Sequence, residues 1–256
     1  MKKLIVFTTL SIFGMSTSAL ASEIYVSGSI GLVDQSSSSN SGETGAFTTG
    51  NLGDGSTLDV AAGTEYGWDT EFDGGAAFAF EIGKKTDSGL RFGLEGLRTK
   101  SDVDTHTNVT LGGGAIGALD AASIASSPDP LGVTVADVVA DGQGDIAQTA
   151  LFVNAYYDFN KQGMLQPYIG AGIGVSDVSV DYSPSNIQVV DDSQTKFAYQ
   201  GKIGVTVAFD SPFEIFGEAA YRATSDVETE NVLFPGNLDI ENEQTSFSAG
   251  VRYTFN

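Results

Sequence analysis

The sequence has no cysteine, one histidine and few basic residues, and each shortage argues against a class of protein. Without cysteine the chain forms no disulfide and carries no lipid of the lipoprotein type. Lysine and arginine number 12 against 33 aspartates and glutamates, so the formal net charge is -21. Nucleic-acid binding needs a basic face, so this composition argues strongly against it.

Long apolar runs are also missing, except at the N-terminus. The chain starts with "MKK", continues with an apolar run over about 4–15, and reaches the small-residue segment "STSALA" that ends at Ala21. The run is too short for a transmembrane helix of ~20 residues. The pattern predicts a Sec signal peptide over 1–21 and one mature domain over 22–256. If the mature domain lies in a membrane, it does not cross it with helices.

The acidic residues gather in four windows that contain no lysine or arginine. Together the windows hold 24 of the 33 acidic residues, and they cover 34–71, 101–145, 176–194 and 224–243. They are also rich in glycine, serine, threonine and asparagine, which is typical of loops. The pattern therefore predicts four long acidic loops, with a short helix in the second near 115–126. After removal of the signal peptide the net charge is about -23.

Eight segments between the windows alternate apolar and polar residues with a period of two. They cover 24–33, 72–82, 90–95, 151–159, 167–175, 196–209, 213–222 and 245–255. This period is the signature of β-strands. Their connections alternate between long and short, which predicts an all-β, eight-stranded antiparallel up-and-down β-barrel.

The two faces of these strands indicate where the barrel lies. The apolar face is bulky, with aromatic residues near both strand ends, as the two interfaces of a bilayer require. The other face carries small residues and ionisable residues of both signs, namely Arg91, Glu95, Lys202, Glu214, Glu218, Arg222 and Arg252. The interior of an eight-stranded barrel is narrow and is filled by side chains. We therefore expect a transmembrane barrel whose apolar face meets lipid and whose charged residues form a network in the lumen.

Several segments carry a resemblance to a known family. They read "YVSGSIG" at 25–31, "NAYYDF" at 154–159, "QPYIGAGIGV" at 166–175, "FAYQGKIGVTV" at 197–207, "FEIFGEAAYR" at 213–222 and "FSAGVRYTF" at 247–255. With this layout the chain resembles the small outer-membrane β-barrel family of OmpA-like transmembrane domains and opacity-type porins. The resemblance implies a Gram-negative outer membrane, four extracellular loops, and a structural or surface-interaction role in envelope integrity, adhesion or antigen exposure.

The resemblance also implies partners in assembly. In this family the last strand ends in an aromatic residue that the barrel-assembly machinery reads, after periplasmic chaperones have carried the chain. Tyr253 and Phe255 fit this signal, and Asn256 departs from it by one residue.

Three residues are expected at the membrane surface. Arg98 and Lys100 continue the outward face of the third strand and mark the outer headgroup level, because a charge facing lipid costs far less there than at the midplane. They are candidates for pairing with lipopolysaccharide phosphates, and a solvated rim is the alternative. Trp68 is interpreted as an interfacial anchor.

One short segment raises the question of a metal site. In "SDVDTHTN" the residues Asp102, Asp104 and His106 would share one side of an extended chain. The segment lacks the glycine and the distal glutamate of an EF-hand loop, so a solvated loop is the favoured interpretation. Weak, collective binding of divalent cations by the four acidic loops is a second hypothesis. No cofactor is expected.

Two alternative functions remain open. The inner charges form either a salt-bridged plug or the wall of a small cation-selective channel, and the narrow lumen favours the plug. Lipid A-modifying barrel enzymes need a histidine beside serine or a carboxylate at the membrane edge. The single histidine lies in a polar segment, so we expect no enzyme. The "GAGIG" segment at 170–174 lacks the spacing of a nucleotide loop, and its glycines are expected to make room for bulky residues opposite.

Overall fold

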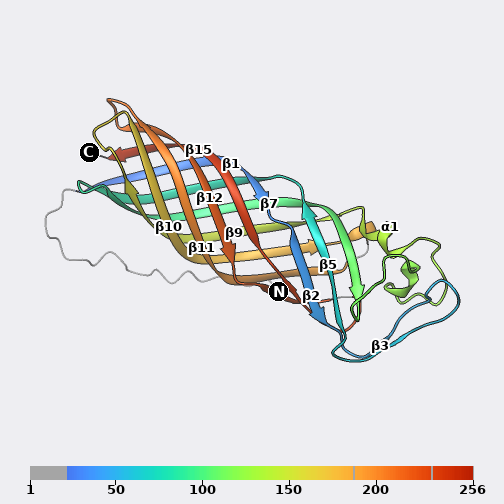
Figure 1. Ribbon diagram of the computed structural model, residues 1–256. Helices are drawn as coiled ribbons and strands as arrows, with labels where there is room; N and C mark the ends of the chain where they lie inside the picture. The colour runs from blue at the N-terminus through green and yellow to red at the C-terminus, as the bar shows by residue number, and fades with distance from the viewer. Residues whose placement is uncertain (1–21, 187, 232, 256) are drawn as a thin grey trace, which may run out of the picture.

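The computed structural model describes residues 22–186, 188–231 and 233–255, so the predicted signal peptide and Asn256 lie outside the described residues. Eight long antiparallel strands form a closed ring (Figure 1). They are β1 (Ser22–Gln35), β6 (Gly75–Thr86), β7 (Leu90–Leu111), β9 (Gly144–Asp158), β10 (Leu165–Tyr182), β11 (Val190–Ala208), β12 (Phe213–Thr224) and β15 (Glu243–Phe255). No helix in these ranges is long and apolar enough to cross a membrane.

The ring closes between its first and last strands. β1 pairs with β15 in the register Ile24 to Phe255, and it pairs with β6 on its other edge. The remaining neighbours follow in chain order, and β12 completes the circuit by pairing with β15. Every strand thus has two hydrogen-bonded neighbours, which is how a barrel removes its sheet edges. The eight-stranded antiparallel barrel predicted from the sequence is confirmed.

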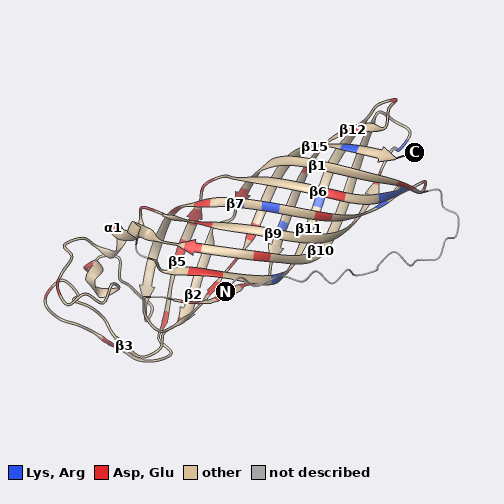
Figure 2. Ribbon diagram, turned by 180° about the vertical axis from the view of Figure 1, so that it is seen from behind, with Lys and Arg blue, Asp and Glu red and all other residues tan. Residues whose placement is uncertain are grey.

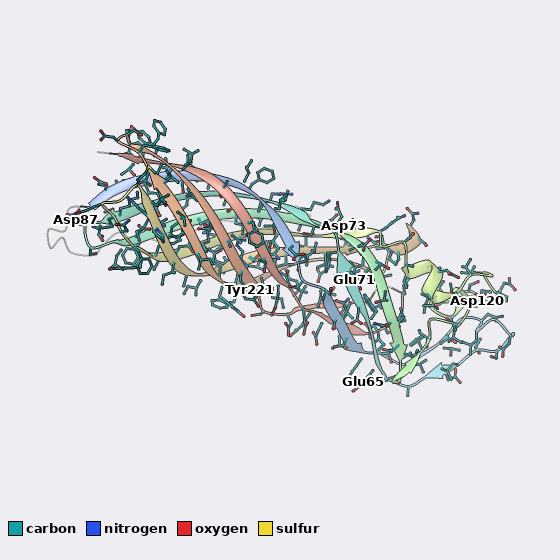
Figure 3. All side chains as sticks on the ribbon, turned by 45° about the horizontal axis from the view of Figure 1, so that its top comes forward. Glu65, Glu71, Asp73, Asp87, Asp120 and Tyr221 are labelled. Atoms are coloured by element: carbon teal, nitrogen blue, oxygen red, sulfur yellow. The ribbon has the colours of Figure 1, made fainter. Side chains whose placement is uncertain are left out.

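The two ends of the ring differ greatly in the length of their connections. Short turns at 87–89, 159–164 and 209–212 lie at the end where the chain terminates, and this end includes Asp87 (Figure 3). The long connections lie at the opposite end, where Glu65 and Asp120 are found. Three of the four connections at that end are long, as the sequence predicts, and the fourth, between β10 and β11, covers only 183–189.

The outer wall of the ring is apolar over the height of a membrane. Large side chains on the outward positions are 40–75% exposed, and they include Ile30, Leu32, Phe78, Phe80, Ile173, Ile203, Phe247 and Val251. Aromatic residues pack together near the short-turn end, with Phe213 and Tyr253 at 4.9 Å between ring centroids and Tyr253 and Phe255 edge-to-face at the same distance. Such a wall is stable only against lipid.

The strands continue well beyond the predicted boundaries, and this corrects the prediction of four long loops. β7 runs on to Leu111, β10 runs on to Tyr182, and β11 already starts at Val190. Much of the second and third acidic windows is therefore strand. The polar composition suggested loops, but inward apolar residues in these windows keep the period of two.

Additional elements complete the wall at the long-loop end. They are the strands β2 (Ser38–Glu43), β3 (Phe47–Thr48), β4 (Asp59–Val60), β5 (Glu65–Phe72), β8 (Gly114–Ala115), β13 (Val227–Glu230) and β14 (Asn237–Ile240). β5 pairs with the upper part of β7, and β2, β14 and β13 follow outward from it. We use "upper" for the end of the barrel that carries the long connections and "lower" for the end that carries the short turns. The additional strands and the upper ends of β7, β9, β10 and β11 together are called the extracellular extension. Phe72 belongs to this extension, because it lies in β5 and not in the ring strand predicted over 72–82.

Within the ranges that the structure describes, helical structure is found only in this extension. η1 (Ala121–Ser123) is a 3-10 turn capped by Asp120, whose carboxylate accepts a hydrogen bond from the amide of Ala122. α1 (Val135–Val139) is one short helix with a capping box between Thr134 and Asp137, and η2 (Pro184–Asn186) follows β10. The helix expected near 115–126 is thus reduced to a single 3-10 turn.

The strand β10 shows how the character of the wall inverts along the chain. Below Ser176 its outward residues are apolar, as at Ile169 and Ile173, and its inward positions are mostly glycine. Above Ser176 the outward residues are Asp177 and Ser179, while Val178, Val180 and Tyr182 point inward and are fully buried. The alternation of the strand is unbroken, but the apolar side changes from the outside to the inside.

Candidate functional site

The lower interior of the ring holds a buried ion-pair network centred on Lys202. Its ammonium group lies between the carboxylates of Glu95 and Glu218, with Nζ 3.0 Å from Glu218 Oε1 and in direct contact with Glu95 Oε2. Tyr168 donates its hydroxyl to Glu218 Oε2 over 2.9 Å. Three strands, β7, β11 and β12, therefore meet at one cation in the lumen.

A second cation, Arg91, packs among aromatic rings below this centre. Its guanidinium carbon lies 3.9 Å from the ring centroid of Tyr156 and 4.9 Å from that of Tyr168. Its Nη2 atom donates to Asp158 over 3.1 Å, and Nη1 lies 3.7 Å from Glu81 Oε1. Stacking and ion pairing together hold the planar group in one orientation.

Glu81 is the acceptor that links the two cation sites. It accepts hydrogen bonds from the hydroxyls of Tyr25 and Tyr156, both over 2.6 Å, and from the amide of Asn154 over 2.8 Å. The side chain is 5% exposed. Three donors satisfy the oxygens of a carboxylate that would otherwise be costly to bury.

The remaining cations lie at the two edges of the network. Near the short turns, Glu214 pairs with Arg252 over 3.0 Å and with Lys85 over 2.5 Å. Further up, Arg222 donates to Gln200 over 2.8 Å and to Ser246 over 2.6 Å. Arg252, near the end of the chain, thus has Glu214 of β12 as its partner.

We call this set the lumen network, and its charges balance. Five cations (Lys85, Arg91, Lys202, Arg222 and Arg252) face five carboxylates (Glu81, Glu95, Asp158, Glu214 and Glu218). The cavity left among these residues is about 20 Å³. All seven charged residues expected in the lumen lie here. Lys85, Glu81 and Asp158 were missed because their partners come from distant strands and depend on the register of the ring.

Glycines on the inward faces make room for the rings of the lumen network. A Cβ atom at Gly170 would lie 2.3 Å from Cδ1 of Tyr156, and one at Gly204 would lie 2.4 Å from Cζ of Tyr168. Neither contact can be accommodated without displacing the ring. Within the "GAGIG" segment, Gly170 thus makes room for Tyr156, and Gly172 makes room for Asn154.

A layer of neutral amides separates the lumen network from the extracellular extension. Asn242 accepts hydrogen bonds from Gln35 over 3.1 Å and from Gln148 over 2.7 Å, and it donates to Thr224 over 3.0 Å. All three amide side chains are buried. These amides are polar but uncharged, and they lie between the charged lumen network and the apolar core of the extension.

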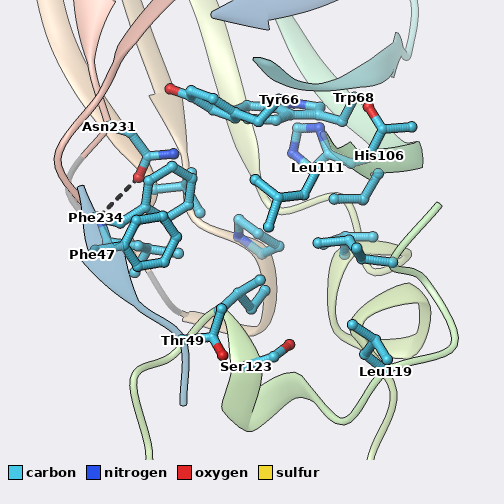
Figure 4. Close-up of a pocket in the computed structure, with 18 of the residues that line it drawn as sticks. Phe47, Thr49, Tyr66, Trp68, His106, Leu111, Leu119, Ser123, Asn231 and Phe234 are labelled. Carbon is cyan, nitrogen blue, oxygen red and sulfur yellow. Dashed lines mark hydrogen bonds between the residues drawn. The ribbon is translucent and has the colours of Figure 1, made fainter. Parts of the chain in front are cut away.

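The interior of the extension is an apolar core. It is built from Tyr66, Val103, Ile146, Val178, Val180, Tyr182, Val190, Val227, Leu238 and Ile240, with Trp68, Phe72, Leu111, Val189 and Phe234 packed against it. A cavity of about 130 Å³ lies beside this core, between β5, β7, the segment around η1 and the connection after β13 (Figure 4). We call it the apolar pocket.

His106 lines the apolar pocket and is 3% exposed. Its Nδ1 atom lies 2.8 Å from the hydroxyl of Thr70, which accepts a hydrogen bond from Asn40 over 2.7 Å. Burial lowers the pKa of His106 to about 4, against the opposing attraction of Asp141. The imidazole is therefore neutral at neutral pH.

This position of His106 separates it from the other metal candidates. Asp102 and Asp104 point outward and are exposed, whereas His106 points inward. The register between β5 and β7 shifts after Val103, because Asp104 is an extra residue opposite the pair Glu71 and Phe72. Such a bulge turns the next side chain to the other face. The described residues contain no cluster of three or more metal-ligating side chains.

The residues expected at the membrane surface are found in two different places. Arg98 and Lys100 point outward from β7, and Lys100 pairs with Asp145 over 3.0 Å and with Asp102 over 3.6 Å. Trp68 instead lies in the extension, where its ring is 6.4 Å from that of His106 and 6.1 Å from that of Tyr66. Its expected role as an interfacial anchor is replaced by packing, because β5 lies beyond the ring.

The opposite rim carries the residues expected to guide assembly. Tyr253 and Phe255 face outward at the end of β15, and Phe255 is 48% exposed. They lie on the edge that joins the last strand to the first.

Acidic residues are spread along the extension, while lysines and arginines concentrate in the barrel (Figure 2). Outward acidic residues continue up β7 and β10 from the ends of their apolar stretches, as at Asp102, Asp104 and Asp177. Exposed Glu65 and Glu71 lie on β5. The charge that the sequence assigns to loops is thus carried in large part by a rigid β-structure.

Comparisons with known proteins agree with this architecture. A family model described as Surface antigen matches residues 59–253. Major surface antigen 4 of Anaplasma marginale is 23% identical over 194 residues, which cover 71% of this chain and 66% of that protein. The chain thus spans slightly less than two thirds of the length of this curated relative.

The solved structure of a small outer-membrane protein shows the same fold. The outer membrane protein OprG from Pseudomonas aeruginosa matches with a TM-score of 0.58 and 13% identity, covering 93% of this chain and 97% of OprG. Neisserial surface protein A matches with a TM-score of 0.46 and 17% identity over 92% of this chain and 99% of that one. Because the family model covers well over half of the residues, the chain belongs to the surface antigen family of outer-membrane β-barrels.

Proposed function

We propose that this surface antigen barrel is a closed scaffold that presents its acidic extracellular extension to the surroundings, without a conducting pore and without enzymatic activity. The observation that carries this proposal is the filling of the interior. The lumen network balances five cations with five carboxylates and leaves a cavity of about 20 Å³. A cavity of this size holds about one water molecule, which is too little for a continuous water-filled path.

Two further layers lie above the lumen network and support a closed barrel. The amides of Gln35, Gln148 and Asn242 bond to one another across the lumen. Above them the interior is apolar, with Val178 and Val180 fully buried. An ion crossing this region would lose its hydration without gaining a ligand, which costs several kcal/mol at least.

The buried position of His106 supports the proposal that the protein is not an enzyme. It is the only histidine in the chain, it is buried in the extension, and its hydrogen-bonded neighbour is Thr70. Acyl-transfer and proteolytic chemistry needs a base that reaches both a nucleophile and the substrate. We expect lipid A to have the same mass spectrum in wild-type and deletion strains, and a changed acylation pattern would contradict this part of the proposal.

Lipid is the first partner in this proposal. Arg98 points outward at the top of the apolar stretch of β7, and no described carboxylate lies within ion-pair distance of it. Lys100, two residues further, has Asp145 and Asp102 as partners. Arg98 therefore offers its guanidinium to a lipopolysaccharide phosphate, for which its planar fork is suited. Binding of labelled lipopolysaccharide should weaken in Arg98→Gln and stay the same in Lys100→Gln.

Divalent cations and assembly factors are the other partners that we propose. The outward carboxylates are spread over the extension, so calcium or magnesium would be held weakly by the whole surface and not by one site. At the other rim, Tyr253 and Phe255 present their rings at the end of β15, where the barrel-assembly machinery and periplasmic chaperones would read them. Phe255→Ala should lower the amount of folded barrel in the outer membrane.

Single-channel recording in planar bilayers tests the closed barrel. The refolded protein should show no steady openings at neutral pH, while a known porin inserted by the same procedure shows them. Heat-modifiable mobility on SDS gels confirms that the inserted protein is a folded barrel. Steady openings near or above the nanosiemens range would overturn the closed scaffold and favour a cation-selective channel.

A further inference from the structure

The apolar pocket in the extension has the features of a binding site for a small molecule. Its volume is about 130 Å³, and it is lined almost entirely by apolar side chains. An engineered cavity of ~150 Å³ with such a lining stays dry and binds benzene. The pocket is therefore of the size that accepts a single ring.

The two sides of the pocket differ in chemistry. One side is aromatic, where Phe234 stacks on Phe47 at 4.9 Å and meets Tyr66 edge-on at 4.9 Å (Figure 4). The other side is aliphatic and includes Leu111 and Leu119. Aromatic side chains prefer ring partners in stacked or edge-to-face geometry. The lining thus favours an aromatic ring over a long flexible chain.

Polar atoms inside the pocket lack partners. Nε2 of His106 and Oγ of Ser123 are buried and have no hydrogen-bond partner among the described residues, and both side chains are 3% exposed. His106 and Ser123 lie on different sides of the pocket (Figure 4). A buried polar atom without a partner carries a free-energy penalty that a suitable ligand removes.

The hydrogen bond at Nδ1 of His106 determines which functional group a ligand needs. Nδ1 of His106 is engaged with Thr70, so only Nε2 is free. In a neutral imidazole Nε2 is either a donor or an acceptor, and a hydroxyl group complements both tautomers. A carboxylate is disfavoured because it would lose its hydration against an apolar wall beside an uncharged ring.

The pocket is close to solvent on one side. Leu58 lines it and is 50% exposed, in the segment that leads into β4. A ligand can therefore enter from outside the cell by displacing one short segment, without passing through the membrane-spanning ring.

We propose that the extracellular extension binds a small neutral aromatic alcohol in the apolar pocket, with the ring between the aromatic and aliphatic walls and the hydroxyl on Nε2 of His106. This site lies above the lumen network and does not depend on whether the barrel conducts. It adds a small-molecule ligand to a protein whose proposed partners are otherwise lipids, cations and surfaces.

The test uses phenol as the probe and Trp68 as the reporter. Trp68 is the only tryptophan of the chain and lines the pocket, so its fluorescence excited near the red edge reports occupancy directly. The full mature chain is refolded into liposomes and titrated with phenol, benzene and benzoate. We expect a saturable change with phenol, binding of benzene about 10-fold weaker because it leaves Nε2 unpaired, and no saturable change with benzoate.

Variants separate specific binding from partitioning into lipid. In His106→Leu the preference for phenol over benzene should disappear while benzene still binds. In the double variant Leu111→Phe with Ile116→Phe the pocket is filled, and the saturable change should be lost for both. Gly201→Ala lies on the lipid face with no atom within 4 Å of the added Cβ and should behave as wild type.

Three outcomes would overturn the proposal. One is the absence of a saturable change with phenol in wild type, and another is equal affinity for phenol and benzene in wild type. The third is an unchanged titration in the filled double variant. A rise in the thermal midpoint of wild type with phenol, absent in the double variant, gives a second readout if the fluorescence change is small.

Discussion

The lower and upper parts of the interior have opposite chemistry although the same strands build both. In the lower part, Lys202 lies between Glu95 and Glu218 and the outside is apolar. In the upper part, Val178 and Val180 fill the inside, and the outside carries Asp177 and Ser179. The solvent around each part explains the difference, because lipid requires an apolar outside and water allows the apolar side chains to turn inward.

This comparison shows what each part depends on. The lower part is held by the closed ladder of backbone hydrogen bonds and by ion pairs that are costly to break singly. The upper part resembles a soluble β-protein, whose stability comes from burial of apolar side chains. Substitutions that are tolerated in one part should therefore be damaging in the other.

The largest effect is expected from removing the central cation of the lumen network. Lys202→Met keeps the volume but leaves the carboxylates of Glu95 and Glu218 without the cation between them. We expect a loss of ~3–5 kcal/mol in the free energy of unfolding, because a buried charge loses its compensation. Urea unfolding in lipid vesicles measures the change.

The matched control for this substitution is Lys100→Met on the outer face. Lys100 also has two carboxylate partners, but its side chain is 52% exposed. An exposed pair contributes only ~0–1 kcal/mol. Equal losses in the two variants would contradict the account of the lower interior.

The next effect concerns the upper interior. Val180→Asp places a carboxylate in the apolar core, whereas Ser179→Asp adds the same group to the outside of the same strand. We expect the first to cost ~3 kcal/mol and to open the extension, and the second to be nearly neutral. Hydrogen exchange of β10 and β11 measures the opening, while heat-modifiable mobility shows that the ring persists. Similar exchange in both variants would show that the upper interior is not an apolar core.

A third effect tests the packing of the lower interior. In Gly170→Ala the new Cβ would lie 2.3 Å from the ring of Tyr156, whereas Gly201→Ala adds its methyl group to open space on the lipid face. We expect a loss of ~1–3 kcal/mol for the first and less than ~0.5 kcal/mol for the second. Thermal unfolding followed by gel mobility compares the two. A stable Gly170→Ala barrel would mean that Tyr156 does not occupy the lumen as described.

The smallest effect is a pH dependence confined to the upper part. The pKa of His106 is lowered to about 4 by burial, so its neutral form is the one that the fold stabilises. The stabilisation is complete above pH ~6.5, the unfolded value, and is lost as the pH falls toward 4, with about 2 kcal/mol lost at pH 5. The protection factors of amides in β5 and β7, which correct for the intrinsic pH dependence of exchange, should therefore fall between these pH values in wild type. The fall should be smaller in His106→Gln, and an identical response in both proteins would exclude His106 as its cause.

The strands of the ring could be predicted from the sequence because the alternation that marks each strand is a local pattern. Alternation along 167–175 or 245–255 is enough to assign a strand, and the position of each acidic window separates long from short connections. The charged residues from Arg91 to Arg252 could be assigned to one face for the same reason. The family and the outer-membrane location follow from the same pattern.

The extension and the pairings could not be predicted because they depend on contacts between distant segments. Asp177 and Asp181 suggested a loop, although Val178 and Val180 between them keep the inward period of a strand. The inward turn of His106 depends on one extra residue opposite β5. The partners of Glu81, from Tyr25 to Tyr156, are fixed by the register of the closed ring, which a single sequence does not contain.

The most direct test of the inversion is cysteine labelling along β10, for which the cysteine-free chain is ideal. Single cysteines at Ile173, Ser179 and Val180 are exposed to a membrane-impermeant thiol reagent in intact cells. We expect rapid labelling of Ser179→Cys and protection of both Ile173→Cys, which faces lipid, and Val180→Cys, which faces the apolar core. Labelling of Val180→Cys as fast as that of Ser179→Cys would contradict the apolar upper interior, and rapid labelling of Ile173→Cys would contradict the membrane-facing lower wall.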